Sequence, residues 1–334
     1  MTDRYPGGTP RPHAVWFRQD LRVDDHRPLL TAAARAERAG APLHCVYVLD
    51  PREFGPAPLL SPHIALKRTG PFRARFLVEC LASLREELRG LGGELIVRRG
   101  DPVSVLAAMA EEERWEALHY HELVGTEERS QEKRLARKLR AGEASVDVTG
   151  HWDRTLHDEY PFEVSETPEV FSRFRKVVEK RLEVAAPELP PKRIPGPGRV
   201  EPGELPTLAE VDAVGIVDDE RAVHRFPGGA KAANEQLSAF VWGGPIATYK
   251  ETRNGLIGAD YSSKLSPWLA LGAISCRRVQ DEVFRFEEER GANESTYWVF
   301  FELLWRDYFQ LIVKRHGARV PRDLDALQAR CPEN

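Results

Sequence analysis

Between residues 13 and 150, short apolar runs of strand length alternate with longer segments of helical period, and no other pattern in the chain limits the possible folds as much. Such alternation is typical of a parallel sheet flanked by helices. The pattern predicts strands at residues 14–17, 43–49, 94–97, 117–121 and 146–149 and helices near residues 28–38, 72–91, 102–113 and 127–140. We therefore expect an α/β N-terminal domain with a five-stranded parallel sheet.

A proline-rich stretch separates this region from the rest of the chain. Seven prolines and several glycines lie between residues 185 and 207, a composition that favours an extended linker. From Gly228 onward the apolar spacing becomes helical. We predict an α/β domain at residues 1–150, an extended interdomain linker at 151–227 and an all-α domain at 228–334.

The composition is that of an ordinary globular protein. Of the 334 residues, 42% are hydrophobic and 30% are charged, and the mean hydropathy is -0.45. The formal net charge is -4 and the pI is about 6.2, so bulk electrostatics does not attract this chain to nucleic acid. Any DNA binding therefore requires a local basic patch.

Several kinds of site and location are disfavoured by the sequence. The four cysteines are scattered without a Cys-x-x-Cys pair, which argues against a disulfide framework and a metal site. No expected strand is followed by a Gly-x-Gly-x-x-Gly or Walker-type loop. The first residues lack the apolar core of a signal peptide, and charges interrupt the apolar stretch 297–313, which disfavours a membrane span. We expect a cytoplasmic protein without a metal.

A charged string, W-F-R-Q-D-L-R-V-D-D-H, begins at Trp16 and follows the first expected strand. Ligands of open α/β sheets bind at the carboxyl ends of strands, so Arg18, Asp20 and Arg22 can line a crevice there. The alternative is a charged turn in which arginine and aspartate side chains pair with one another. The residues alone favour the charged turn.

A second string places three hydroxyls and one amine, from Ser262, Ser263, Lys264 and Ser266, at an expected helix start. Free backbone N–H groups and the positive end of the helix dipole favour a phosphate at such a place. Plain N-capping by Ser262 or Ser266, with Pro267 at the first helical position, explains the same residues. Both interpretations stay open, and they do not exclude each other.

A third string predicts a long central helix that starts near Asn293 or Ser295 and ends at Gly317. Glu302 and Arg306 lie four residues apart, on one face, among aromatic and aliphatic residues. An unpaired charge in such surroundings would cost several kcal/mol. Without further context, the residues favour a buried ion pair between these two side chains.

These strings resemble the photolyase/cryptochrome family, and the resemblance covers nearly the whole chain. The first string is similar to that family's opening motif, W-F-R-x-D-L-R-x-x-D. The string Y-K-E-T-R-N-G-x-x-G-A-D-Y-S, which starts at Tyr249, looks specifically like DASH cryptochromes, and S-T-Y-W-V-x-F-E-L-L-W-R-D-Y-F looks like the family's central helix. The resemblance implies an antenna domain followed by a helical FAD-binding domain.

The resemblance also implies roles for individual residues. FAD would be held through its diphosphate and ribitol by Tyr249, Ser262, Ser263, Lys264, Leu265 and Ser266, and Arg306 would face the flavin. Glu302 would bind the pyrimidine dimer and Trp305 would pack against the flipped lesion. An antenna pigment, 5,10-methenyltetrahydrofolate, would contact Glu122.

The implied activity is light-driven repair of cyclobutane pyrimidine dimers, in single-stranded DNA, by electron transfer from reduced FAD. The alternatives are a blue-light signalling cryptochrome without repair and an inactive truncated remnant. A basic rim for DNA is predicted at Lys250, Arg253, Arg277, Arg278, Lys314, Arg315, Arg319 and Arg322, or else a surface of mixed charge. The family's later string T-G-x-P-x-x-D-A-x-M-R does not occur here, so we expect an incomplete helical domain, which a second chain can complete.

Overall fold

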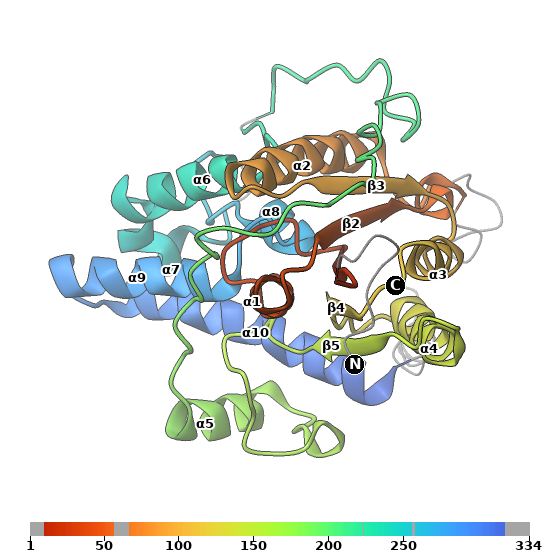
Figure 1. Ribbon diagram of the computed structural model, residues 1–334. Coiled ribbons are helices and arrows are strands. Elements are labelled where there is room, and N and C mark those ends of the chain that lie inside the picture. Colours follow the sequence, from red (N-terminus) through yellow and green to blue (C-terminus); the bar gives the residue numbers. More distant parts are fainter. Residues whose placement is uncertain (1–9, 57–66, 223, 256–257, 318–334) are drawn as a thin grey trace, which may run out of the picture.

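Five parallel strands form the sheet that the alternating pattern predicts (Figure 1). The computed structural model describes residues 10–56, 67–222, 224–255 and 258–317. The strand order is β3-β2-β1-β4-β5. The strands are β1 (His13–Phe17), β2 (Leu43–Leu49), β3 (Leu95–Arg99), β4 (Ala117–His121) and β5 (Asp147–His151). The predicted fold class of the first domain is confirmed.

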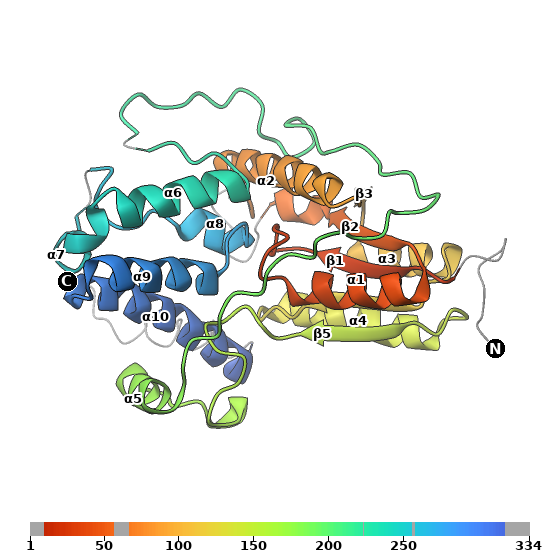
Figure 2. The same cartoon turned by 60° about the vertical axis from the view of Figure 1, so that its left-hand side comes forward.

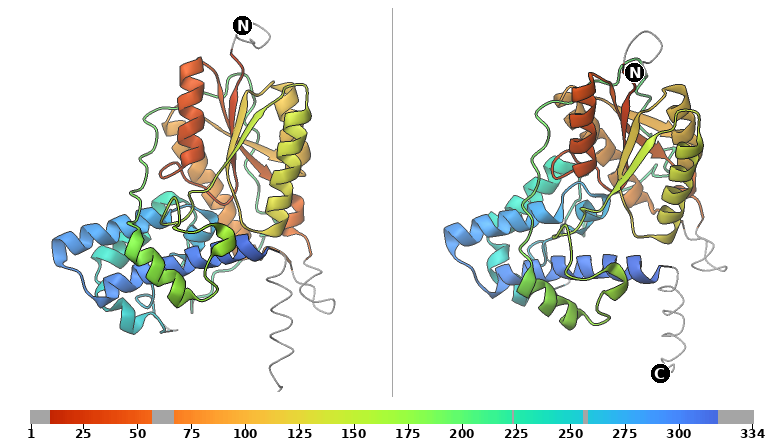
Figure 3. Two further views of the ribbon diagram at one scale, coloured as in Figure 1. Left: turned by 90° about the horizontal axis from the view of Figure 1, so that it is seen from below. Right: turned by 60° about the horizontal axis from the view of Figure 1, so that its bottom comes forward.

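Helices cover both faces of this sheet (Figure 3). They are α1 (Arg27–Ala39), α2 (Pro71–Gly90), α3 (Pro102–Glu112) and α4 (Thr126–Ala141), and a short 3-10 turn, η1 (Pro51–Phe54), follows β2. Along β1, Val15 and Phe17 join the apolar cluster of α1 and α2, whereas Ala14 and Trp16 join that of α3 and α4. Successive side chains of a strand point to opposite faces, so β1 is buried on both.

The segment between the sheet and the helical region is not extended throughout, in contrast to the linker predicted at 151–227. It contains η2 (Val164–Glu166) and α5 (Phe171–Arg181), and α5 contacts the last long helix. The proline-rich part follows the α/β domain closely, since the Leu43 amide donates to the Gly196 carbonyl and the Val97 amide to that of Pro202. Figure 2 shows this chain crossing the domain surface.

The remainder is helical, as the apolar spacing predicts. It comprises α6 (Ala230–Trp242), η3 (Pro245–Thr248), α7 (Tyr249–Thr252), α8 (Ser266–Leu271), α9 (Cys276–Arg290) and α10 (Glu294–His316). Asn293 caps α10 in a capping box with Thr296. Among the described residues, no helix has the length and apolar character needed to cross a membrane. α8 and α10 lie beside the sheet edge where the strands end (Figure 2).

Candidate functional site

The loop after β1 joins the two regions of the molecule. The Leu21 amide donates to the Leu271 carbonyl over 3.1 Å, and Arg22 Nη1 donates to the Gly272 carbonyl over 3.1 Å. Gly272 ends α8 at φ +67°, and a Cβ there would lie 2.3 Å from the Gln19 carbonyl oxygen. Only glycine permits so close an approach of the two backbones. The charged string after the first strand is therefore an interdomain contact.

The charged side chains of this loop do not pair with one another as the charged-turn interpretation expects. Arg18 donates through Nη2 to Glu132 Oε1 over 2.7 Å and to the His121 carbonyl, and its guanidinium lies 4.2 Å from the ring centre of Trp16. Asp20 and Arg22 are only 1% and 2% exposed. These two residues stabilise the loop and do not line an open crevice.

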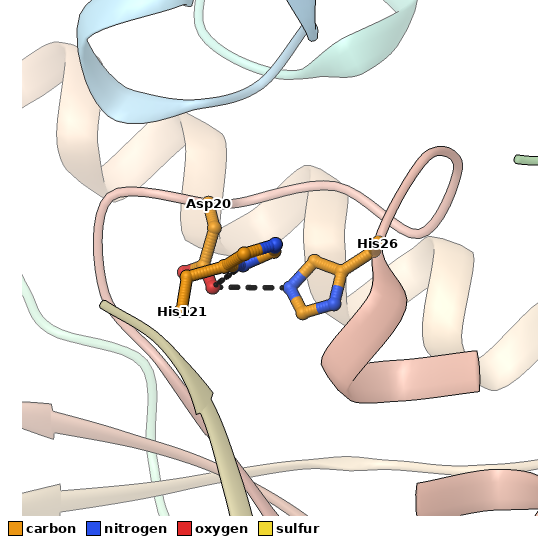
Figure 4. A group of neighbouring side chains, drawn as sticks. All are labelled: Asp20, His26 and His121. Carbon is orange, nitrogen blue, oxygen red and sulfur yellow. Dashed lines mark hydrogen bonds and ion pairs between the residues drawn. The ribbon is translucent and has the colours of Figure 1, made fainter. Parts of the chain in front are cut away.

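Asp20 is the centre of a buried cluster with two histidines (Figure 4). His121 Nδ1 lies 2.7 Å and His26 Nε2 lies 3.1 Å from Asp20 Oδ2, and His121 Nε2 lies 2.7 Å from Asp153 Oδ1. Burial alone would raise the pKa of Asp20, but hydrogen bonds from both histidines lower this pKa well below its usual value. Burial lowers the pKa of His26 to about 4.

The cluster has atoms close enough together for a metal, but its hydrogen bonds argue against one. His26 Nδ1 accepts the Leu29 amide over 3.1 Å. A neutral imidazole that accepts at Nδ1 carries its proton at Nε2, so His26 donates to Asp20 and has no lone pair there for an ion. The cluster thus anchors β4 and the start of α1 to the loop after β1.

A cavity of about 620 Å³ lies between the α/β domain and the helical region. The predicted site residues that line it are Tyr249, Ser263, Leu265, Ser266, Glu302 and Arg306. Apolar side chains from α8 and α10 complete much of the wall, among them Leu269, Val299 and Leu303. The volume is in the range of cofactor sites, roughly 300–1,000 Å³.

The serine-rich turn before α8 differs from the helix cap that was one of its two explanations. α8 has six residues, begins at Ser266 after Leu265 and receives no side-chain cap. Ser262 and Ser263 Oγ lie 3.4 and 3.5 Å from the amides of Lys264 and Leu265, which are long contacts. Ser262 and Lys264 have positive φ angles, 64° and 57°. Pro267 is the second residue of α8 and not the first, and neither Ser262 nor Ser266 provides the predicted N-cap.

Tyr249 offers a hydrogen-bond donor to this cavity. Burial, with the nearby Glu302 carboxylate, raises the pKa of Tyr249 to about 12, so the hydroxyl stays protonated at neutral pH. Among the described residues the hydroxyl has no hydrogen-bond partner. It is therefore free to donate to a ligand.

Glu302 and Arg306 do not form the buried ion pair that their spacing suggests. Glu302 Oε1 accepts from Arg253 Nη1 over 2.7 Å, and its side chain is 34% exposed. Arg306 Nη1 donates to the Arg154 carbonyl over 2.7 Å and lies 3.5 Å from Asp307 Oδ1. That prediction is wrong because Glu302 is paired instead with Arg253, which directly follows α7.

Trp305 and Glu122 are not among the residues that line this cavity, although their neighbours Arg306 and Leu123 are. The Trp305 ring stacks on Phe171 of α5, with ring centres 3.5 Å apart and an angle of 13° between the ring planes. It also stacks on Phe309, with ring centres 5.4 Å apart. Glu122 follows β4 and accepts from Lys314 Nζ over 2.9 Å. The structure thus places these two predicted site residues in contacts with other parts of the protein.

A second cavity, of about 680 Å³, lies in the α/β domain at the carboxyl edge of the sheet. Its lining includes Trp16, Arg18, Tyr47, Asp50, Arg52 and Arg134. Ligands of open parallel sheets bind at this edge. Arg18 was expected at this edge from the sequence. Trp16 and Tyr47 lie on β1 and β2, Asp50 and Arg52 follow β2, and Arg134 lies on α4.

The predicted basic rim is largely a surface of mixed charge. Arg277 is 1% exposed and donates to the Thr155 carbonyl and to Asp158. Lys250 pairs with Glu294, and Arg278 lies near Asp281 and Glu282. Arg319 and Arg322 lie outside the described residues.

Comparisons with known proteins agree with this architecture. A family model described as DNA photolyase matches residues 13–193. The cryptochrome DASH of Gloeobacter violaceus is 44% identical over 309 residues, which are 92% of this chain and 60% of that protein. The cryptochrome DASH of Synechocystis is 37% identical over 311 residues, 92% of this chain and 61% of that protein. The chain therefore spans about 60% of the length of these curated relatives.

Solved structures show the same similarity. A cryptochrome structure from Synechocystis superposes with a TM-score of 0.85 at 36% identity, covering 92% of this chain and 62% of that one. A class III photolyase from Agrobacterium tumefaciens gives a TM-score of 0.73 at 23% identity, covering 91% and 59%. The second of these likenesses shows the shared fold alone.

Proposed function

Because this chain belongs to the DNA photolyase family, we propose that its interdomain cavity binds FAD and that its activity is light-driven repair of pyrimidine dimers in single-stranded DNA. The observation that carries the proposal is the convergence of Tyr249, Ser263, Ser266, Glu302 and Arg306 on one cavity. These residues come from α7, from α8 and the turn before it, and from α10. No single stretch of the sequence brings them together.

The residues of the cavity fit the chemistry of a flavin nucleotide. The protonated Tyr249 hydroxyl and the hydroxyls of Ser263 and Ser266 can donate to phosphate oxygens. Lys264 would add a positive charge from the same turn. The apolar wall of Val299 and Leu303 suits a flat ring system.

Glu302 would contact the damaged base. Its carboxylate can accept the imide N–H of a thymine, and Arg253 holds it in one orientation. Photolyases take the damaged base out of the helix stack, which places it within reach of a partly exposed side chain. Reduced FAD, when bound, would supply the electron that starts repair.

Trp305 keeps its proposed role of stacking on the flipped lesion, under a structural condition. One face of its ring is covered by Phe171. A base can stack there only when α5 moves aside, because two groups cannot occupy the same face.

An antenna pigment is the remaining part of the proposal. We place 5,10-methenyltetrahydrofolate beside Glu122, whose carboxylate would exchange its bond with Lys314 for one to the pterin. An ultraviolet band that Glu122→Gln removes would support this placement. A band of equal intensity in that variant would contradict it.

The flavin site is tested by FAD binding to the double variant Lys264→Ala and Ser266→Ala. We expect a loss of affinity of about a hundredfold or more, since hydrogen bonds to charged groups contribute about 1.5–3 kcal/mol each and the variant removes two of these groups. Equilibrium dialysis with FAD measures it. The matched control changes Ser172 and Lys176, which are exposed on α5, to alanine. Equal affinity in both double variants would remove the turn from the flavin site.

The lesion site is tested by Glu302→Ala and Glu302→Gln in flavin-loaded, reduced protein. Alanine should lower the rate of light-dependent repair of dimer-containing single strands, and glutamine should retain more activity because its carbonyl still accepts a hydrogen bond. An unchanged rate in Glu302→Ala would exclude Glu302 from repair. Flavin photoreduction without any repair by the unaltered chain would favour a blue-light receptor instead.

A further inference from the structure

Arg154 follows β5 and enters the interdomain cavity on a backbone that is fixed from several sides. Its carbonyl accepts from Arg306 Nη1 over 2.7 Å and lies 3.6 Å from the thiol of Cys276. The next carbonyl, of Thr155, accepts from Arg277, and the Leu156 amide donates to Asp307 over 2.7 Å. These contacts fix where the Arg154 side chain starts.

The Arg154 guanidinium itself has no partner. Although it is only partly exposed, it makes no hydrogen bond or ion pair with any described residue, and it lines the 620 Å³ cavity. Burial, followed by repulsion from Arg306, lowers the pKa of Arg154 to about 9; Arg22 and Arg18 add to this effect and Asp20 opposes it. A desolvated cation without a partner is unfavourable.

The carboxylates around the cavity do not neutralise this charge. Glu302 is bonded to Arg253. The carboxylate of Glu128 lies against Gly125, where a Cβ would meet its Oε2. Arg73 and Arg306 line the cavity as well. Asp307 offsets part of the charge of Arg306, since its Oδ1 lies 3.5 Å from Arg306 Nη1. No carboxylate of the described residues pairs with Arg154.

We infer that Arg154 and Arg306 form an anion-binding site in the interdomain cavity that takes a phosphate or diphosphate group. Two guanidinium groups can offer paired N–H donors, the geometry that phosphate oxygens accept well. An anion there would replace the missing partner of Arg154. This inference shares its cavity with the proposed flavin site, but binding of inorganic diphosphate does not depend on a flavin.

The test is calorimetric titration of the full chain with inorganic pyrophosphate at constant ionic strength. Arg154→Gln should weaken binding about tenfold, the loss expected for one hydrogen-bonded charge. The affinity of Arg154→Lys should lie between those of the unaltered chain and Arg154→Gln, because lysine keeps the positive charge but lacks the paired N–H donors of the guanidinium. Arg173→Gln on the exposed side of α5 is the matched control. Equal pyrophosphate affinity in all four proteins would overturn the inference.

A second readout separates binding from a structural role. Without pyrophosphate, Arg154→Gln should raise the midpoint of thermal unfolding, because it removes an unpaired desolvated charge. A lowered midpoint together with unchanged pyrophosphate binding would show that Arg154 is purely structural and overturn the inference.

Titrations with FAD and riboflavin identify the source of the phosphate. If Arg154→Gln weakens FAD but not riboflavin, the site holds the diphosphate of the flavin nucleotide. If the unaltered chain binds pyrophosphate but not FAD, the anion site stands and the flavin proposal fails. An equal loss for FAD and riboflavin, with pyrophosphate unaffected, would refute the anion site and leave the flavin proposal in place.

Discussion

Replacing Asp307 by asparagine should remove a loss of stability that the unaltered chain undergoes between about pH 4 and pH 6. Asp307 lies on α10 and is 0% exposed. Its Oδ2 accepts from the Leu156 amide over 2.7 Å and from the Tyr160 hydroxyl over 3.0 Å. Among the described residues, the only charged partner of its Oδ1 is Arg306 Nη1, at 3.5 Å. Burial therefore outweighs these contacts and raises the pKa of Asp307 to about 6.

The sign and size of the effect follow from this shift. A folded-state pKa above the unfolded value of 3.8 favours the folded protein when the carboxyl is protonated, and this contribution disappears as the pH rises through about 6. The difference of about 2 pKa units corresponds to about 3 kcal/mol. Asparagine has no such titration, and its carbonyl can still accept both hydrogen bonds. The free energy of unfolding of Asp307→Asn, relative to the unaltered chain, should therefore rise by about 3 kcal/mol between pH 4 and pH 7.

Urea denaturation at half-unit intervals from pH 4 to pH 7.5, followed by tryptophan fluorescence, measures this difference. The exposed Asp260→Asn variant reports the effect of removing one carboxylate from the surface. Parallel pH profiles for Asp307→Asn and the unaltered chain would refute the assignment of the titration to Asp307. A relative loss of stability with rising pH would show that its hydrogen bonds outweigh the cost of burial.

Two further outcomes test the contacts around the candidate site. Gly272→Ala should destabilise the chain by more than about 2 kcal/mol, because its Cβ would lie 2.3 Å from the Gln19 carbonyl oxygen. The control Gly291→Ala, also at positive φ but with no atom within 4 Å of its Cβ, should cost less stability. Thermal unfolding compares the two variants, and equal losses of stability would show that the close approach at Gly272 is unimportant. Phe171→Leu should uncover one face of Trp305 and so increase the quenching of tryptophan fluorescence by acrylamide. The control Phe72→Leu, at an exposed position, should leave the quenching unchanged. Unchanged quenching in Phe171→Leu would contradict the stacking of Phe171 on Trp305.

The elements of the fold were largely predictable because their signals are local. A strand that is buried on both faces needs a continuous apolar run, and the run predicted at 14–17 falls within β1. The start of α10 was predictable for the same kind of reason, since Asn293 caps amides within the next turn. The composition of the segment 151–227 did not predict α5, because this helix depends on contacts with α10, which is distant in the sequence.

The candidate site was predictable in its residues more than in its contacts. The strings that resemble the photolyase family identified Tyr249, Ser263, Ser266, Glu302 and Arg306, which line one cavity. The spacing of Glu302 and Arg306 indicated a partnership that the structure does not contain. Neither Arg154 nor Asp307 carried a pattern of its own, since an isolated charge in an irregular segment or within a helical string has no periodic signal.

The sequence by itself determined the alternation of strands and helices along the first domain, the ends of α10 and the family, because these features depend on residues close together along the chain. Only the tertiary structure decided which charges meet: Arg253 and Glu302 are 49 positions apart, and Leu156 and Asp307 are 151 apart. Such pairs form only when segments that are far apart in the sequence pack against α10 at one distance and orientation. The apolar pattern of each helix fixes which face is buried, but it does not fix the neighbour that this face meets.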